Sequence, residues 1–238
     1  MNITALGLNH KQLGELVKSS SGDVCIDDCL GQRFIGCAEK SKKITINGVP
    51  GNALGAYLDG AVIEVNGNVQ DAVGDTMNDG KIIVHGNAGD ALGYAMRGGS
   101  IFVKGDSGYR TGIHMKEYKN KKPVIVIGGS VGSFLGEYQA GGLIVVMGLA
   151  TTEMPVGNFT GTGIHGGSIF IRTKKEPTNL PSQVQLSVAK AGDLTEIEPY
   201  VSEFAELFGF DAKALLTDNF YVLTPSARNP YKQLYTLH

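Results

Sequence analysis

A repeat of short β-branched triplets organises the chain from residue 44 to residue 172. Successive triplets start 19, 19, 19, 24, 19 and 25 residues apart, so two of the six units carry five or six extra residues. A fixed period of this length with strand-like triplets predicts an all-β solenoid in which each unit is one coil, about seven coils in all. The triplets are Ile44–Ile46, Ile63–Val65, Ile82–Val84, Ile101–Val103, Ile125–Ile127, Ile144–Val146 and Ile169–Ile171.

Glycines follow the same period, at positions four and eleven after the start of each triplet. Glycine adopts positive φ at little cost and lets backbones approach closely, so we expect it at the corners where a coil bends. Because these glycines are periodic and the residues between them are apolar, the repeat is not a flexible Gly-rich linker. The predicted structural glycines are Gly48, Gly55, Gly67, Gly74, Gly86, Gly93, Gly105, Gly112, Gly129, Gly136 and Gly148.

The triplets also predict which side chains face inward. Their first and third residues are always Ile or Val, as expected for ladders in a dry interior. The middle residues face outward, and after Thr45 and Glu64 they become apolar. A long apolar stripe is not left in water, and we expect the C-terminal tail to cover it rather than another subunit. The stripe consists of Ile83, Phe102, Val126, Val145 and Phe170.

Two flanking segments complete a predicted division into three parts. Residues 1–23 form an N-terminal cap with a helix from Asn9 to Lys18, and residues 24–175 form the solenoid, starting with an imperfect coil. Residues 176–238 form a tail with a strand over 183–188 and a helix from about Glu198 to Phe208, stopped by Gly209. A shorter helix over 211–216 and a docking peptide from Tyr221 onward follow.

Composition and charge exclude several classes of protein. Lys and Arg number 21 against 23 Asp and Glu, a net charge of −2, which argues against binding nucleic acid or a membrane surface. No long apolar run or leader is present, which predicts a cytoplasmic protein. Cys25, Cys29 and Cys37 are spaced unlike zinc knuckles or iron–sulfur runs, so we expect no metal site.

The two long units carry the residues that point to function, because insertions in solenoids collect on binding faces. Arg110 and His114 replace small residues of neighbouring coils, and Gly-Ile-His recurs at His165. These side chains either form an anion-binding or acid–base cluster, or bind loop carbonyls or a partner protein. The sequence shows no paired acids or nucleophile beside them, so we favour the second reading and expect no catalytic residue. The candidate partner contacts are Arg110, His114, Lys116, Glu117, Tyr118 and His165.

Several long motifs resemble a known family. The coils over 67–77 and 86–99, the run Gly108–Lys116, Gly136-Glu137-Tyr138 and Gly163–Gly167 are similar to the GXGXG domain that closes the large subunit of glutamate synthase. The resemblance covers roughly residues 24–175. A subunit of formylmethanofuran dehydrogenase shares the same kind of repeat.

The resemblance implies a right-handed parallel β-helix without catalytic residues of its own. In glutamate synthase this domain packs between the glutaminase domain and the synthase domain that holds FMN and an iron–sulfur cluster. Here Asn2 follows Met1 where the enzyme has its nucleophilic Cys, and no barrel-length region could hold a flavin. The chain therefore resembles a free-standing structural subunit without a cofactor. Its expected partners are a glutaminase-type amidotransferase subunit and an FMN-binding glutamate synthase subunit, in glutamate biosynthesis.

Three alternatives stay open. The chain could be the scaffold of a formylmethanofuran dehydrogenase or an N-methylglutamate synthase complex. It could also be a β-helix enzyme acting alone, although the matched coils lack a ladder of Asp residues. Self-association through an exposed end coil would make it a homo-oligomer.

Overall fold

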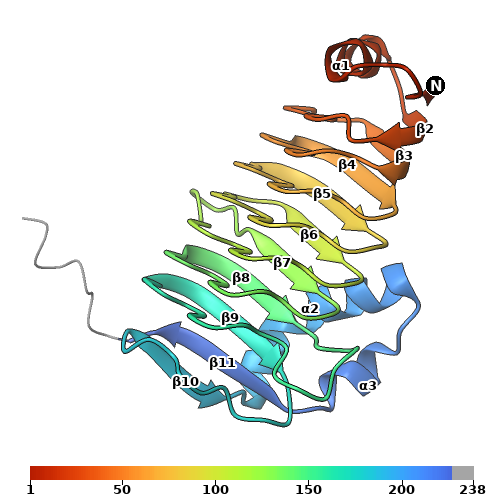
Figure 1. The fold of residues 1–238 in the computed structure, drawn as a ribbon. Helices are drawn as coiled ribbons and strands as arrows, with labels where there is room; N and C mark the ends of the chain where they lie inside the picture. The colour runs from red at the N-terminus through yellow and green to blue at the C-terminus, as the bar shows by residue number, and fades with distance from the viewer. Residues whose placement is uncertain (227–238) are drawn as a thin grey trace, which may run out of the picture.

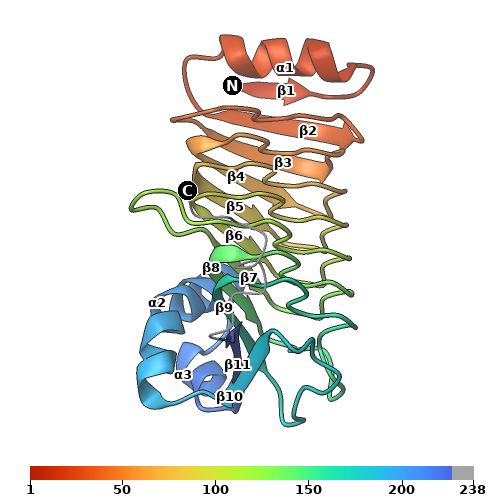
Figure 2. The ribbon, with the colours of Figure 1, turned by 90° about the vertical axis from the view of Figure 1, so that its left-hand side faces the viewer.

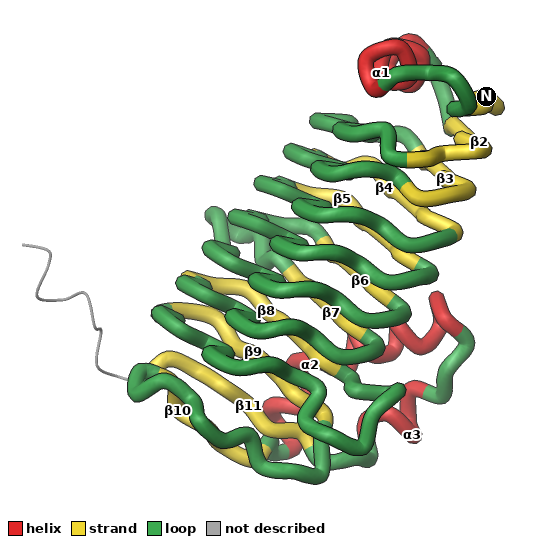
Figure 3. Tube along the Cα trace, in the orientation of Figure 1, coloured by secondary structure: helices red, strands yellow, loops and turns green. Residues whose placement is uncertain are grey.

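The computed structural model describes residues 1–226 and shows a parallel β-solenoid (Figure 1). Each coil contributes one strand to a single sheet, and loops and turns complete the coil (Figure 3). The predicted β-helical fold is thus confirmed. The parallel strands are β1 (Asn2–Thr4), β2 (Val24–Leu30), β3 (Lys43–Val49), β4 (Asp59–Asn66), β5 (Asp79–Val84), β6 (Ser100–Val103), β7 (Val124–Ile127), β8 (Ala140–Val146) and β9 (Gly166–Arg172).

The triplets align across the sheet as their spacing predicted. Ile44 pairs with Ile63, and the same column continues through each later strand to Ile169. The first and third residues of the triplets are buried in one continuous core inside the coils. The extra residues of the two long units leave this pairing intact, because they are accommodated outside the strands. The interior also buries the columns Leu54, Val73, Leu92 and Leu135, and Leu58, Met77, Met96 and Met115.

A helix closes the N-terminal end of the core. In α1 (His10–Ser19), Asn9 accepts from the amides of Lys11 and Gln12, as expected of an N-cap. Leu13 and Val17 are buried in the solenoid core. The sequence analysis missed β1, which pairs in parallel with β2 and precedes the helix. Three residues are too few to show a period, and their pairing depends on a partner more than twenty residues away.

The other end of the sheet departs from the predicted tail. Strand β10 (Val184–Val188) forms as expected, but β11 (Phe220–Pro225) lies between it and β9, antiparallel to both. The expectation of a docking peptide from Tyr221 is therefore wrong for residues 221–225. This segment extends the sheet because Val222 and Leu223 are buried against it. Residues 227–238, the remainder of that predicted peptide, lie outside the described residues.

Helices α2 (Ala191–Phe208) and α3 (Ala212–Leu216) lie on the outer face of the sheet (Figure 2). The predicted apolar stripe packs there against α2 in a second core, so the tail covers it. Helix α2 ends where the outer face of the sheet becomes polar. There the ring of Phe208 packs edge-on against His85, and His85 contacts the carboxylate of Glu64. The residues that α2 buries are Ile197, Val201, Phe204, Ala205 and Phe208.

The predicted start of α2 was wrong. The helix begins at Ala191 rather than near Glu198, with Pro199 inside it. Proline removes a helical hydrogen bond and favours a first-turn position, so its place inside this helix is not the usual one. In the structure, the carboxylate of Asp193 accepts from the amide of Lys190 at 2.7 Å and fixes an earlier start. Gly209 ends the helix with φ 76°, as predicted. The division of the chain into three domains stays a prediction.

Candidate functional site

The periodic glycines of the coils differ in backbone conformation. Glycines eleven residues after each triplet start have positive φ, from 64° at Gly55 to 71° at Gly112. At the other predicted position, Gly48 and Gly148 also have positive φ. Gly67, Gly86, Gly105 and Gly129 do not, and a β-carbon on any of these four would collide with the coil before. These glycines serve close approach rather than left-handed backbone.

Two columns of other residues share the left-handed conformation. They lie nine and thirteen residues after a triplet start, except that Phe159 lies 15 residues after Ile144 because the second long unit carries an insertion before it. Apart from Phe159, the amides of these residues donate to carbonyls of the following coil, whereas the glycines between the two columns donate to the preceding coil. Inter-coil hydrogen bonds thus compensate the cost of this backbone, on the order of 1 kcal/mol or more per residue. The first column holds Ala53, Ala72, Ala91, Arg110, Phe134 and Phe159, and the second holds Tyr57, Thr76, Ala95, His114 and Tyr138.

Within these columns, Arg110 and His114 each belong to a stack of side chains. The guanidinium carbon of Arg110 lies 4.9 Å from the ring centroid of Phe134, which stacks on Phe159 at 5.0 Å. The ring of His114 stacks on Tyr138 with centroids 5.2 Å apart and an interplanar angle of 9°. Tyr94 meets His114 edge-on at 5.9 Å. We call this surface the aromatic edge and define it as Tyr94, Arg110, His114, Phe134, Tyr138 and Phe159.

The aromatic edge contains an ion pair and is exposed. Arg110 Nε donates to Glu137 Oε2 at 3.2 Å, and Glu137 precedes Tyr138 of the other stack in the sequence. Tyr94, Tyr138 and Phe159 are exposed by 40%, 38% and 56%. Exposed aromatic and Arg side chains in one patch are typical of protein interfaces. The sequence analysis missed Phe134, Tyr138 and Phe159. The repeat arithmetic that placed Arg110 and His114 also reaches Phe134 and Tyr138, but not Phe159, which follows the insertion of the second long unit.

His165 does not lie in the column of the solenoid that contains His114. The amide of His165 donates to the carbonyl of Gln139, whereas the amide of His114 donates to Glu137. The second Gly-Ile-His is therefore shifted along its coil, and Gly163 rather than His165 takes the left-handed position. Nδ1 of His165 lies 3.0 Å from the carbonyl oxygen of Gly163. The repeated motif thus gives no matched pair of imidazoles.

The bulge over residues 117–122 is tied to its own chain. The carboxylate of Glu117 accepts from the amide of Gly142 at 3.0 Å, and Tyr118 pairs with Lys121 in a tight turn. Lys121 Nζ lies 2.9 Å from Asp79, and its ammonium holds the pKa of that carboxyl below its usual range. Lys122 binds Glu196 on α2. Lys116 and Tyr118 remain exposed, so the role of these residues in partner contact stays a prediction.

The cysteines do not converge on a metal site. Cys29 is buried, and this burial raises the pKa of its thiol to about 11. Within residues 1–226, no three His, Cys, Asp or Glu side chains are grouped so that they could hold a metal ion. No helix in the same range is long and apolar enough to span a membrane.

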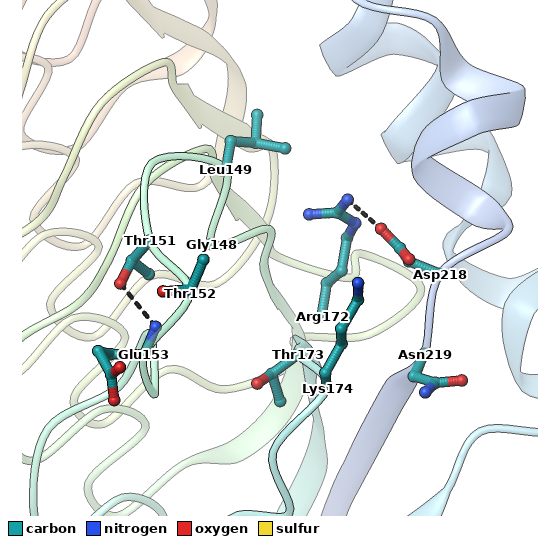
Figure 4. A pocket seen from close by; sticks show the side chains of 10 residues that line it. All are labelled: Gly148, Leu149, Thr151, Thr152, Glu153, Arg172, Thr173, Lys174, Asp218 and Asn219. Carbon is teal, nitrogen blue, oxygen red and sulfur yellow. Dashed lines mark hydrogen bonds and ion pairs between the residues drawn. The ribbon is translucent and has the colours of Figure 1, made fainter.

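A pocket of about 260 Å³ lies where the second long unit meets the end of β9 (Figure 4). The loop from Gly148 to Glu153 forms one wall, Arg172 to Lys174 another, and Asp218 with Asn219 the third. Arg172 is fixed by the carbonyl of Met147 and by an ion pair with Asp218. The sequence analysis named none of these as site residues, because the three walls come from distant segments.

Comparison with known proteins identifies the family. The GXGXG motif matches residues 21–227, which is most of the chain. The chain belongs to the GXGXG motif family. This match extends past the coils into the tail that covers them.

One relative and one solved structure extend along nearly the whole chain. The uncharacterized protein MJ1350 of Methanocaldococcus jannaschii is 41% identical over 249 residues, covering 98% of this chain and 95% of that protein. A chain of the formyltransferase/hydrolase complex (FhcABCD) from Methylorubrum extorquens, solved with methylofuran, matches with a TM-score of 0.63 and 18% identity. That match covers 90% of this chain and 86% of the other, and at this identity it establishes a shared fold.

Proposed function

We propose that this chain is a structural subunit of a multi-subunit enzyme complex and that partners dock on its aromatic edge. The observation that carries the proposal is the edge itself. The first column holds Ala53, Ala72 and Ala91 in the earlier coils, whereas the later coils carry rings stacked in register in both columns. Ordered exposed rings lose little conformational entropy when a partner covers them, which favours binding. Membership in the GXGXG family supports a role beside other subunits.

The complex that we favour is of the glutamate synthase type. The motif runs around Arg110, Tyr138 and His165 resemble the domain that joins the two catalytic parts of that enzyme. In this proposal a glutaminase-type subunit releases ammonia and an FMN and iron–sulfur subunit uses it. This chain holds the two together in the cytoplasm and contributes neither cofactor nor catalytic residue.

A second candidate is the scaffold of a formyl-transferring complex. The observation that favours it is the likeness to a chain of the formyltransferase/hydrolase complex, which includes most of the tail as well as the coils. A subunit of formylmethanofuran dehydrogenase shares the same kind of repeat, so this second candidate includes a complex of that type.

A pull-down of the tagged full chain from its host separates the two candidates. We expect a yellow eluate with flavin absorbance and glutaminase activity, and both should remain with the partners when the complex is dissociated. Formyltransferase or hydrolase activity without flavin would replace the first candidate with the second. Recovery of this chain without any other subunit would contradict both.

A further inference from the structure

We propose that the pocket between the Gly148–Glu153 loop and the end of β9 binds a small oxyanion, the carboxylate or phosphate group of a small molecule. The pocket belongs to this chain alone and lies among residues distinct from the aromatic edge. The inference is therefore independent of the proposed scaffold role.

The charges that line the pocket leave one cation uncompensated. Asp218 is paired with Arg172, and Glu153 is paired with Lys175, which does not line the pocket. Among residues 1–226, Lys174 has no acidic partner within ion-pair distance. Its side chain extends in the same direction as that of Arg172, two residues before it (Figure 4). One free ammonium beside neutralised acids favours an anion.

Two hydroxyl groups add directed donors. Thr151 Oγ1 accepts from the amide of Glu153 at 3.0 Å, and Thr173 Oγ1 accepts from the amide of Lys175 at 3.1 Å. Each hydroxyl thus uses a lone pair in its own turn, which holds the side chain in place and leaves its O–H to donate. The two O–H groups and the Lys174 ammonium come from two walls of one pocket.

The size and the origin of the pocket agree with this ligand class. A volume of about 260 Å³ is below the range of roughly 300–1,000 Å³ that is usual for drug-sized ligands, so the pocket suits a small anion or an anionic head group. One wall is the insertion of the second long unit, and insertions in solenoids collect on binding faces. Asp218 holds Arg172 in position and keeps the site from accumulating excess positive charge.

The test is an NMR titration of the full-length, isotope-labelled chain with sodium phosphate and, separately, sodium acetate, each against sodium chloride at equal ionic strength. We expect saturable shifts of the amides of residues 149–153 and 173–175. Saturation by phosphate alone assigns a phosphate ligand, by acetate alone a carboxylate, and by both the oxyanion class in general. Shifts that grow linearly with either salt, or that equal those in chloride, would overturn the inference.

Matched variants assign the effect to the pocket. Lys174→Gln should weaken binding about fivefold, the value of a partly exposed charged contact. Thr151→Val with Thr173→Val should weaken it further, and the unchanged spectrum elsewhere would report an intact fold. Lys11→Gln makes the same charge change on α1 at the opposite end of the solenoid and should leave binding unchanged. Equal affinity of Lys174→Gln and the parent chain would refute the site.

Discussion

The ring of Phe204 on α2 packs directly against Gly128, which follows β7. A β-carbon on Gly128 would lie 2.8 Å from Cζ of Phe204, closer than real side chains approach. Lys104 and Met147 occupy the equivalent position in the neighbouring coils. The missing side chain at Gly128 thus leaves the space in which the helix anchors its largest fully buried side chain, Phe204.

Phe204→Ala should lower the free energy of unfolding by about 3–5 kcal/mol, because it removes a fully buried ring and leaves a cavity between α2 and the sheet. Urea denaturation followed by circular dichroism would measure the loss. Glu206→Ala, an exposed change on the same helix, should alter stability by less than about 0.5 kcal/mol. Equal effects of the two substitutions would show that α2 does not anchor on the sheet through Phe204.

Tyr138→Ala should weaken binding of the partner subunit about tenfold or more while leaving the fold intact, since exposed aromatic residues at the centre of an interface carry much of its binding energy. The matched control is Tyr57→Ala. Tyr57 occupies the same column with the same left-handed backbone and is 53% exposed, but it lies outside the aromatic edge. Surface plasmon resonance with the co-purified partner would compare the two. Similar losses for both variants would argue against docking at the aromatic edge.

Gly48→Ala should destabilise the chain by roughly 1–3 kcal/mol or more. Gly48 has φ 131°, and an added β-carbon would strike the backbone of Cys29 in the coil before it. Gly14→Ala provides the opposite case, because Gly14 lies inside α1 with open space around its α-carbon. This substitution should raise stability by about 0.5–1 kcal/mol. The two melting temperatures should therefore shift in opposite directions, and a shared direction would contradict the assignment.

Glu64 should make stability depend on pH at the acidic end. Hydrogen bonds from His85 and Lys43 lower the pKa of its carboxyl below the usual 4.5, so the folded state binds a proton less readily than the unfolded chain. The resulting stabilisation is present above that value and is lost as the pH falls through the folded pKa. Glu64→Gln should therefore cost more stability at pH 6 than at pH 3, as measured by urea midpoints. A cost that stays constant between these two values would rule out this linkage.

The period of the sequence determined the architecture by itself. The recurrence of the triplets determined the pairing from Ile44 to Ile169, and the alternation within them determined which side chains are buried and which form the outer stripe. These features follow from local periodicity, because each coil contacts its neighbours in the same way. The cap at Asn9 and the stop at Gly209 were predictable for a similar reason, since both act within one helical turn.

The tertiary structure decided the features that do not follow the sequence repeat. Strand β11 lies between β9 and β10, and the pocket joins the Gly148 loop to Arg172 and Asp218, because packing brings together segments that are distant in sequence. The shift of His165 relative to His114 arose in the same way, from inter-coil hydrogen bonds that set where the extra residues of the long unit are accommodated. Local motifs such as Gly-Ile-His cannot report that placement, because it depends on which carbonyls the neighbouring coil presents.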